Sequence, residues 1–388
     1  MSTHVIEPVD AAGVAAALSQ ASADGRSVIV RGAGTKIAPR TSDVILSTVR
    51  MTQSVDHVAG DLVATLPAGI SLDDANDILR RERQWLPLDP PRSQRATIGG
   101  IVATNDSGPR RHRFGAPRDL IIGIEIALVD GRVAKAGGRV VKNVAGYDLS
   151  KLMCGSHGTL AVVTRATFKL SPVAPFSRTL VATGDDLRRL STLALTIANA
   201  PPLAPTAIEL QSPPHRLLVR FETTEGGVDA QTKIAAGLCE QFGVTTHVVS
   251  GQAEADAWRA HEARIFGTPG VVVKIAVLPT DVGDMVADIE RLSSNAAVVC
   301  EISGRAALGI VLLKMSGDHK AYGSILTELR GVAGARGGSA VVVSAGSDGA
   351  MPTFDHWGPI GDAQPLMQAV KARFDPQHIL NAGLTPWD

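Results

Sequence analysis

Three glycine-rich segments separate strand-like runs in the first 160 residues, and they constrain the fold more than any other feature. They read RGAGTK at 31–36, TIGGIVATNDSG at 97–108 and GGRVVKNVAGYDLSKLMCGSHGTL at 137–160. Successive glycines let backbone N–H groups approach a bound molecule without an intervening Cβ atom, which is how backbone amides hold phosphate oxygens. One glycine-rich turn alone indicates only a turn. Three of them favour a site for a phosphate-containing dinucleotide.

Polar side chains in these segments support the same interpretation. Arg31 and Lys36 add positive charge to the first segment. Lys142 and Asn143 stand beside small apolar residues in the third, which indicates either a polar partner or a solvated loop. Hydroxyl donors are supplied by Thr35, Thr97, Thr104 and Ser107.

Other phosphate-binding and hydrolase motifs do not fit. A Rossmann fingerprint needs a third glycine that opens a helix, but Ile37 stands at that position and Pro39 follows it. The sequence also lacks GxxxxGK[ST], HExxH and GxSxG. Nicotinamide-dependent dehydrogenases, P-loop enzymes, zincins and serine hydrolases are therefore not indicated.

The composition narrows the function classes. Basic and acidic residues balance at 38 each, so no overall field favours nucleic acid or an anionic membrane, and aromatic residues, at 4%, are too few for a base-stacking surface. Cys154, Cys239 and Cys300 lie far apart, which argues against a zinc site, an iron–sulfur cluster or a disulfide framework. The N-terminus has no signal-peptide pattern, and no run approaches the roughly 18 apolar residues that span a bilayer. We expect a cytoplasmic protein, and association with a membrane through partners stays open as an alternative.

The pattern along the chain predicts an α+β fold. Helices are expected at 10–22 and 71–83, each after a capping residue, and at 185–199 and 228–241. A hairpin with a type I′ turn is expected at Asp130–Gly131. Proline-containing segments near 171–175 indicate a domain boundary, after which residues 176–345 predict a sheet covered by helices on one face.

Taken together, the three glycine-rich segments and FDPQHILNAG near the end of the chain resemble the FAD-binding subunit of bacterial glycolate oxidase. This family belongs to the vanillyl-alcohol-oxidase-type flavoproteins. The resemblance is dense over the first ~175 residues and clear over the last ~15. It implies a two-part PCMH-type FAD-binding domain at 1–175, an α/β cap or substrate domain at 176–345, and a segment at 346–388 that packs back on the FAD domain.

The resemblance also implies FAD as the cofactor and a set of cofactor-binding residues. Two departures from the family pattern refine this expectation. The first loop has no histidine and no cysteine stands where a second covalent link would be, so we expect non-covalent FAD. Catalytic relatives often have histidine pairs that hold a metal near the substrate, but the corresponding region here reads SAGSDGAMP, so we expect no metal ion. RGAGTK would form the pyrophosphate loop, and the other two segments would line the flavin. The implied residues are Arg31, Gly32, Ala33, Gly34, Thr35, Lys36, Pro67, Ala68, Gly69, Ile70, Thr97, Ile98, Gly99, Gly100, Ala103, Thr104, Asn105, Gly108, Arg118, Asp119, Lys142, Asn143, Ala145, Gly146, Tyr147, Gly158, Thr159, Leu160, Val162 and Asn381.

Catalytic side chains are expected from the middle domain. Oxidation of a 2-hydroxy acid needs a cation for the carboxylate and a base for the hydroxyl proton. Arg264 and Lys274 are candidates for the first role, and His261 and His356 for the second. The sequence is equally compatible with a Lys274 side chain that extends from an edge strand to solvent and with histidines that lie on the surface.

The family resemblance implies partners: a larger FAD-containing subunit and an iron–sulfur subunit that receives electrons. The implied reaction is oxidation of glycolate or D-lactate to the 2-oxo acid. Two alternatives stay open, a structural flavin subunit without turnover of its own and a stand-alone flavin-dependent hydroxy-acid oxidase.

Overall fold

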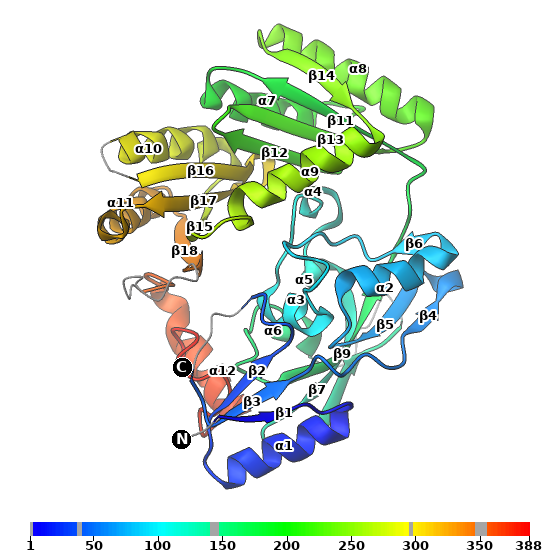
Figure 1. Cartoon of the computed structure of the whole chain (residues 1–388), viewed down its shortest axis with the longest axis vertical. Coiled ribbons are helices and arrows are strands. Elements are labelled where there is room, and N and C mark those ends of the chain that lie inside the picture. Colours follow the sequence, from blue (N-terminus) through cyan, green and yellow to red (C-terminus); the bar gives the residue numbers. More distant parts are fainter. Residues whose placement is uncertain (1–2, 37–40, 140–146, 295–297, 346–354) are drawn as a thin grey trace. The chain divides into compact units, whose positions relative to one another are not determined.

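The chain divides into two units, one formed by Met1–Val173 with Ile360–Asp388 and the other by Ala174–Pro359. The computed structural model (Figure 1) describes residues 3–36, 41–139, 147–294, 298–345 and 355–388. The first unit ends close to the boundary expected from the sequence, and the second continues past residue 345. The last residues of the chain, 360–388, belong to the first unit.

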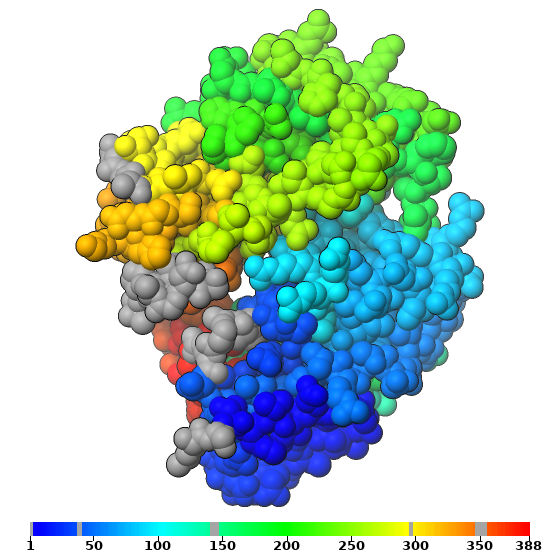
Figure 2. All heavy atoms as spheres, viewed as in Figure 1, coloured from blue at the N-terminus to red at the C-terminus, as the bar shows by residue number. Residues whose placement is uncertain are grey.

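The first unit begins with a small parallel sheet. Its strands β1 (His4–Ile6), β3 (Val44–Ser47) and β2 (Val28–Arg31) lie in that order. Helix α1 (Ala11–Ala23) packs against it and begins where the Asp10 carboxylate accepts a hydrogen bond from Gly13 N at 2.8 Å. Its exposed side chains form part of the dark blue surface in Figure 2. Ile379 and Leu380, from the end of the chain, complete this core.

A five-stranded antiparallel sheet forms the rest of the first unit. Its apolar face packs against α2 (Leu72–Leu79) and α3 (Ile98–Thr104), so this core is one strand layer and one helix layer. Its order is β4 (Asp56–Val58), β5 (Val63–Pro67), β9 (Val162–Lys169), β7 (Ile121–Ala127) and β8 (Val133–Gly137). Shorter elements are β6 (Gln84–Trp85), β10 (Ser171–Pro172), α4 (Arg111–Phe114), α5 (Pro117–Leu120) and α6 (Leu149–Met153); α12 (Gln364–Phe374) follows much later in the chain.

The hairpin formed by β7 and β8 is confirmed, but its expected turn type is wrong. A type I′ turn needs a positive φ at both central residues. Only Gly131 has one, at 83°, while Asp130 does not. The loop is longer than two residues, because Leu128 N donates to Arg132 O at 2.9 Å and Gly131 N to Leu128 O at 3.0 Å. The Asp-Gly pair therefore ends a wider turn.

The second unit is built on one eight-stranded antiparallel sheet. Its order is β14 (Thr245–Val249), β11 (Phe176–Thr183), β13 (Arg216–Thr223), β12 (Ala207–Ser212), β16 (Val298–Arg305), β17 (Ile310–Gly317), β15 (Val271–Ala276) and β18 (Ser339–Ser344). One face forms the apolar core with α7 (Leu187–Asn199), α8 (Glu225–Gln241), α10 (Val282–Ser294) and α11 (Tyr322–Ala335).

This sheet consists of two halves with the same topology. Each half runs β-α-β-β-α-β, first through β11 to β14 and then through β15 to β18. The halves meet where β12 pairs with β16, so the strand order of one half mirrors that of the other. This is the ferredoxin-like arrangement used twice. The sequence shows no repeat of fixed period that would reveal it.

The expectation that helices cover only one face of this sheet is wrong. Helix α9 (Gly251–Phe266) crosses the opposite face, as Figure 1 shows. Polar contacts contribute to holding it there. The Glu254 carboxylate accepts hydrogen bonds from Ser177 Oγ at 2.6 Å and Thr179 Oγ1 at 2.7 Å, and it pairs with Arg220 at 3.2 Å. The polar face of α9 explains why its periodicity gave no clear core signal.

Candidate functional site

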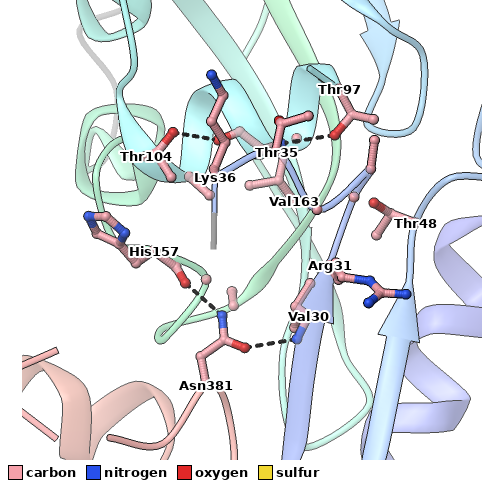
Figure 3. Close-up of a pocket in the computed structure, with 18 residues that line it drawn as sticks. Val30, Arg31, Thr35, Lys36, Thr48, Thr97, Thr104, His157, Val163 and Asn381 are labelled. Carbon is pink, nitrogen blue, oxygen red and sulfur yellow. Dashed lines mark hydrogen bonds between the residues drawn. The ribbon is translucent and has the colours of Figure 1, made fainter. Parts of the chain in front are cut away.

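A pocket opens in the first unit where β2 ends and the chain turns into the segment 31–36 (Figure 3). The pocket is open to solvent, and the space within it and at its mouth together is ≈ 580 Å³. Its walls come from five parts of the sequence: the end of β2 with its loop, Thr48 after β3 (Val44–Ser47), the helix α3 with its cap Thr97, the 157–163 region and the C-terminal tail. The lining residues are Val30, Arg31, Gly32, Ala33, Gly34, Thr35, Lys36, Thr48, Thr97, Gly99, Gly100, Ala103, Thr104, His157, Gly158, Ala161, Val163 and Asn381.

The loop after β2 presents unused backbone donors to this pocket. Within the described part of the chain, the backbone N–H groups of Gly32, Ala33, Gly34 and Thr35 donate no hydrogen bond. Gly34 has a φ of 69°, a conformation that a residue with a Cβ atom adopts only at a cost. Consecutive amides in such a loop are suited to oxygen atoms of a phosphate or pyrophosphate group. The expected pyrophosphate loop thus has the donors that this role needs.

The charge in this loop is distributed differently from the expectation. The Lys36 ammonium forms an ion pair with Asp106 and donates to Pro91 O at 2.9 Å. Its positive charge is therefore largely balanced inside the protein. Arg31, at the edge of the pocket, is exposed. An anionic ligand at this loop would meet the Arg31 guanidinium and the backbone amides before it met Lys36.

Helix α3 is fixed against the loop by close packing. Ile98 N donates to Ile70 O at 2.9 Å and Gly99 N donates to Ala68 O at 2.8 Å, so the segment 67–70 holds the first turn of the helix. Thr97 caps the helix and lies against Gly32, where an added Cβ atom would be 2.1 Å from Thr97 Oγ1. Pro67 to Ile70 therefore lie behind the pocket wall and position it.

Several expected cofactor residues have structural contacts outside the pocket lining. Asn105 Oδ1 accepts a hydrogen bond from Arg118 N at 3.2 Å, and Asp119 caps α5 by accepting from Ala116 N at 2.8 Å. At Gly108 an added Cβ atom would be 1.8 Å from Asp89 O. Of the other residues in this group, Tyr147 is 93% exposed, and four are buried: Ile98, Thr159, Leu160 and Val162.

Four expected cofactor residues lie outside the described residues: Lys142, Asn143, Ala145 and Gly146. Conversely, the pocket includes five residues that the sequence analysis did not assign to it, namely Val30, Thr48, His157, Ala161 and Val163. Val30 and Val163 belong to strands, and strand periodicity shows only which residues alternate, not which face meets a ligand. The sequence around these five residues therefore did not indicate that they line a pocket.

In the second unit, the expected base His261 is buried in a polar cluster on the α9 side of the sheet. Its Nδ1 lies 2.7 Å from Gln211 Nε2, while its Nε2 lies 3.0 Å from Ser303 Oγ and 3.2 Å from Glu209 Oε2. The side chain is only 6% exposed. Arg305 pairs with the other oxygen of Glu209 at 3.4 Å. Both imidazole nitrogens are thus engaged within the unit, and His261 holds α9 on the sheet.

The other expected catalytic residues have further contacts in the second unit. Arg264 donates to Pro213 O and pairs with Glu301 at 3.8 Å; burial lowers the pKa of its guanidinium, and the Glu301 carboxylate opposes this effect. Lys274 lies half-buried in β15, on the same side of the sheet as α9, between Leu312 and Val341 on the neighbouring strands. His356 accepts a hydrogen bond from Val342 N at 2.7 Å through its backbone oxygen.

The three thiols are not poised for reaction. Burial raises the pKa of Cys154 to about 12 and the pKa values of Cys239 and Cys300 to about 11. They are therefore protonated at neutral pH. Among the described residues, no group of three or more His, Cys, Asp or Glu side chains is arranged to hold a metal ion. In that same part of the chain, no helix has the length and apolar character needed to cross a membrane.

Comparison with known proteins supports the interpretation of this pocket as a cofactor site. The family model of the FAD binding domain matches residues 2–137. The chain is 25% identical to glycolate oxidase subunit GlcD of Bacillus subtilis, over 99% of this chain and 88% of the relative. It is 29% identical to glycolate oxidase subunit GlcE of Escherichia coli, over 94% of each chain. A shorter region, 43% of this chain and 38% of the relative, is 37% identical to D-lactate dehydrogenase of Archaeoglobus fulgidus.

Solved structures agree on the fold. Alkyldihydroxyacetonephosphate synthase superposes with a TM-score of 0.76 at 16% identity, over 98% of this chain and 75% of that one. The α+β fold with an FAD-binding domain is thus confirmed, and so is FAD as the cofactor. The pocket suits this molecule because a glycine-rich loop offers four successive amides beside an exposed arginine. The chain is a flavoprotein of the oxidoreductase class.

Proposed function

We propose that this chain is the FAD-binding subunit of a glycolate oxidase or dehydrogenase complex that converts glycolate or D-lactate into the 2-oxo acid. The observation that carries the proposal is the pairing of two facts. Two glycolate oxidase subunits match this chain over nearly its whole length. The pocket that would hold the cofactor is built from the same glycine-rich segments that carry the resemblance.

The reaction removes a hydride from Cα of the hydroxy acid and a proton from its hydroxyl group. Bound FAD supplies the hydride acceptor. The amides of Gly32 to Thr35 would hold the pyrophosphate, and α3 with the 157–158 turn would hold the rest of the molecule in place. The protein must also bind the substrate carboxylate and accept the proton.

The second unit would supply the cation for the carboxylate from Arg264 or Lys274, and the base from His261 or His356. The Arg264 guanidinium is engaged by Pro213 O and Glu301, and both nitrogens of His261 have partners within the unit. Either residue would have to exchange these contacts for the substrate.

Electrons taken from the substrate must leave the chain. The described part of the chain holds no group of cysteines or histidines suited to a cluster, and its thiols are protonated at neutral pH. We therefore propose an iron–sulfur partner subunit and a larger FAD-containing subunit. The subunit names of the relatives support an assembly of several chains.

A second candidate is a flavin subunit that has no turnover of its own. It is favoured by the engagement of His261 and Arg264 in contacts that hold the second unit together. In that case the substrate would be oxidised on the partner, and this chain would relay electrons or support the assembly.

An anaerobic titration of the isolated chain tests these possibilities. Glycolate or D-lactate is added while the visible absorbance of the flavin is followed. Bleaching by either substrate supports turnover on this chain, and slow reoxidation in air then supports transfer to a partner, whereas rapid reoxidation indicates a stand-alone oxidase. Absence of bleaching in the isolated chain, with bleaching in the co-purified complex, supports the second candidate. No bleaching in either preparation contradicts both.

A further inference from the structure

The C-terminal tail, defined here as Lys371–Asp388, is fastened to the first unit by a buried charge cluster. The side chains of Lys371 and Asp375 are both fully buried and lie 2.7 Å apart. The Lys371 ammonium also donates to Thr159 O at 2.9 Å and to Leu380 O at 3.0 Å. All three of its protons thus have acceptors, and Asp388 adds a second carboxylate at 3.3 Å. A buried ammonium requires such complete pairing.

The same cluster sets the path of the tail. The Asp375 carboxylate accepts hydrogen bonds from Ile379 N at 3.2 Å and Leu380 N at 2.8 Å. This directs residues 379–381 along the edge of β2, where Val28 N donates to Ile379 O and Asn381 N donates to Val28 O, both at 2.8 Å. The tail therefore extends the small sheet at the strand that leads into the pocket loop.

Asn381 then joins two walls of the pocket. Its Oδ1 accepts from Val30 N at 2.8 Å, and its Nδ2 donates to His157 O at 2.6 Å (Figure 3). Val30 and His157 both line the pocket. Packing is tight at the neighbouring Gly158, where an added Cβ atom would be 2.8 Å from Asn381 Nδ2. One amide side chain thus sets the separation between the end of β2 and the 157–158 turn.

We propose that the C-terminal tail is a clamp for the FAD site, with Asn381, Lys371 and Asp375 as positioning residues, and that FAD binding and tail docking stabilise each other. Two hydrogen bonds hold the 157–159 turn to the tail. Lys371 donates to Thr159 O, and Asn381 donates to His157 O. If the docked tail raises the affinity for FAD by some factor, bound FAD must favour the docked tail by the same factor. The proposal concerns the cofactor alone and does not depend on the substrate.

The first test uses Asn381→Asp in the full chain. Aspartate keeps the oxygen that accepts from Val30 N but replaces the donor to His157 O with a second acceptor. We expect the Kd for FAD, measured by flavin fluorescence on the apoprotein, to rise about tenfold, the factor that corresponds to about 1.4 kcal/mol for a lost hydrogen bond. Lys371→Met should raise the Kd at least as much.

The matched control is Asn76→Asp. Asn76 is also a buried amide in the first unit, and it accepts from Leu86 N at 2.8 Å and donates to Leu86 O at 3.2 Å, away from the pocket and the tail. This variant should lower the melting temperature of the apoprotein and leave the Kd for FAD unchanged. An equal loss of FAD affinity in Asn76→Asp and Asn381→Asp would attribute the effect to general destabilisation and overturn the proposal.

Limited proteolysis of the wild-type chain tests the reciprocal effect. Saturating FAD should slow cleavage within the tail, and the protection should be smaller in Asn381→Asp at equal occupancy. If Lys371→Met does not fold, the Kd of Asn381→Asp for FAD and the proteolysis with and without FAD still test the coupling between the tail and the FAD site. Tail cleavage at the same rate with and without FAD, or an unchanged Kd in Asn381→Asp, would contradict the coupling.

Discussion

Gly100 offers a sharp test of where the cofactor lies, because helix stability and cofactor binding should change in opposite directions. The residue is in the first turn of α3 and lines the pocket. An added Cβ atom there would be 3.2 Å from Thr97 Oγ1 and 4.0 Å from Lys36 Cγ; among the described residues, it would have no further heavy atom within 4 Å apart from its chain neighbours and the backbone of its own helix. It would therefore project into the space assigned to FAD.

The magnitudes follow from these distances. Replacing a helical glycine with alanine favours the helix by up to about 1 kcal/mol, reduced here by the close approach to Thr97. In the pocket, however, overpacking costs about 1–3 kcal/mol, which corresponds to a roughly 5- to 150-fold weaker Kd for FAD. We expect Gly100→Ala to bind FAD about tenfold more weakly and Gly100→Leu to be purified without flavin.

The assay measures flavin content after purification, the Kd for FAD by fluorescence, and the melting temperature of the apoprotein. Gly237→Ala is the matched control, because this glycine lies in α8 of the second unit. In the described part of the chain, an added Cβ atom would have no heavy atom within 4 Å beyond its chain neighbours and its own helix backbone. It should favour the helix by a similar amount and leave FAD binding unchanged. Gly100→Leu with wild-type flavin content and Kd would remove this part of the pocket from the cofactor site.

Three further predictions concern stability and reactivity. Hydrogen bonds from Ser27 lower the pKa of Asp43 below 3.8, so the contribution of this carboxylate to stability is present above that pH and is lost as the pH falls through the lowered value. The melting temperatures of wild type and Asp43→Asn, measured from pH 2 to 6, should therefore converge at the acidic end, and a constant difference would contradict this. His261→Ala should lower the free energy of unfolding of the second unit by about 1–3 kcal/mol, because it leaves Glu209 and its neighbours short of a partner; denaturant unfolding should show this with unchanged flavin content, and an unaltered midpoint would refute the structural role. The three thiols should react with a thiol reagent at pH 8 only after denaturation, since burial raises their pKa values to about 11 or 12; rapid labelling of the native protein would contradict this.

Local features of the fold were predictable because their signals lie within a few residues. Asp10, Ser71 and Asp186 each cap the helix that follows, so α1, α2 and α7 begin where the sequence indicates. The loop at 31–36 was recognisable in the same way, since glycines after a strand favour exposed amides over continued regular structure. These choices depend on the backbone conformation of adjacent residues.

The order of the strands in the second unit depended on tertiary structure alone. Its two halves share a topology without sharing a sequence, because the fold requires only alternation and length from each strand, which many sequences satisfy. The same holds for His261, whose sequence context is equally compatible with an exposed or a buried helix face. Its burial follows from partners on β12 and β16, which are distant in the chain.

The candidate site divides in the same manner. The sequence predicted the glycine-rich loop and Thr97 as a hydroxyl donor, and the family resemblance added Asn381. Only the folded chain decided that Lys36 is paired with Asp106 and that Lys371 reaches Thr159, 212 residues away along the chain. The physical reason is that a buried charge is stable only beside its partners. Those partners are brought together by the packing of the whole unit, and no local pattern records them.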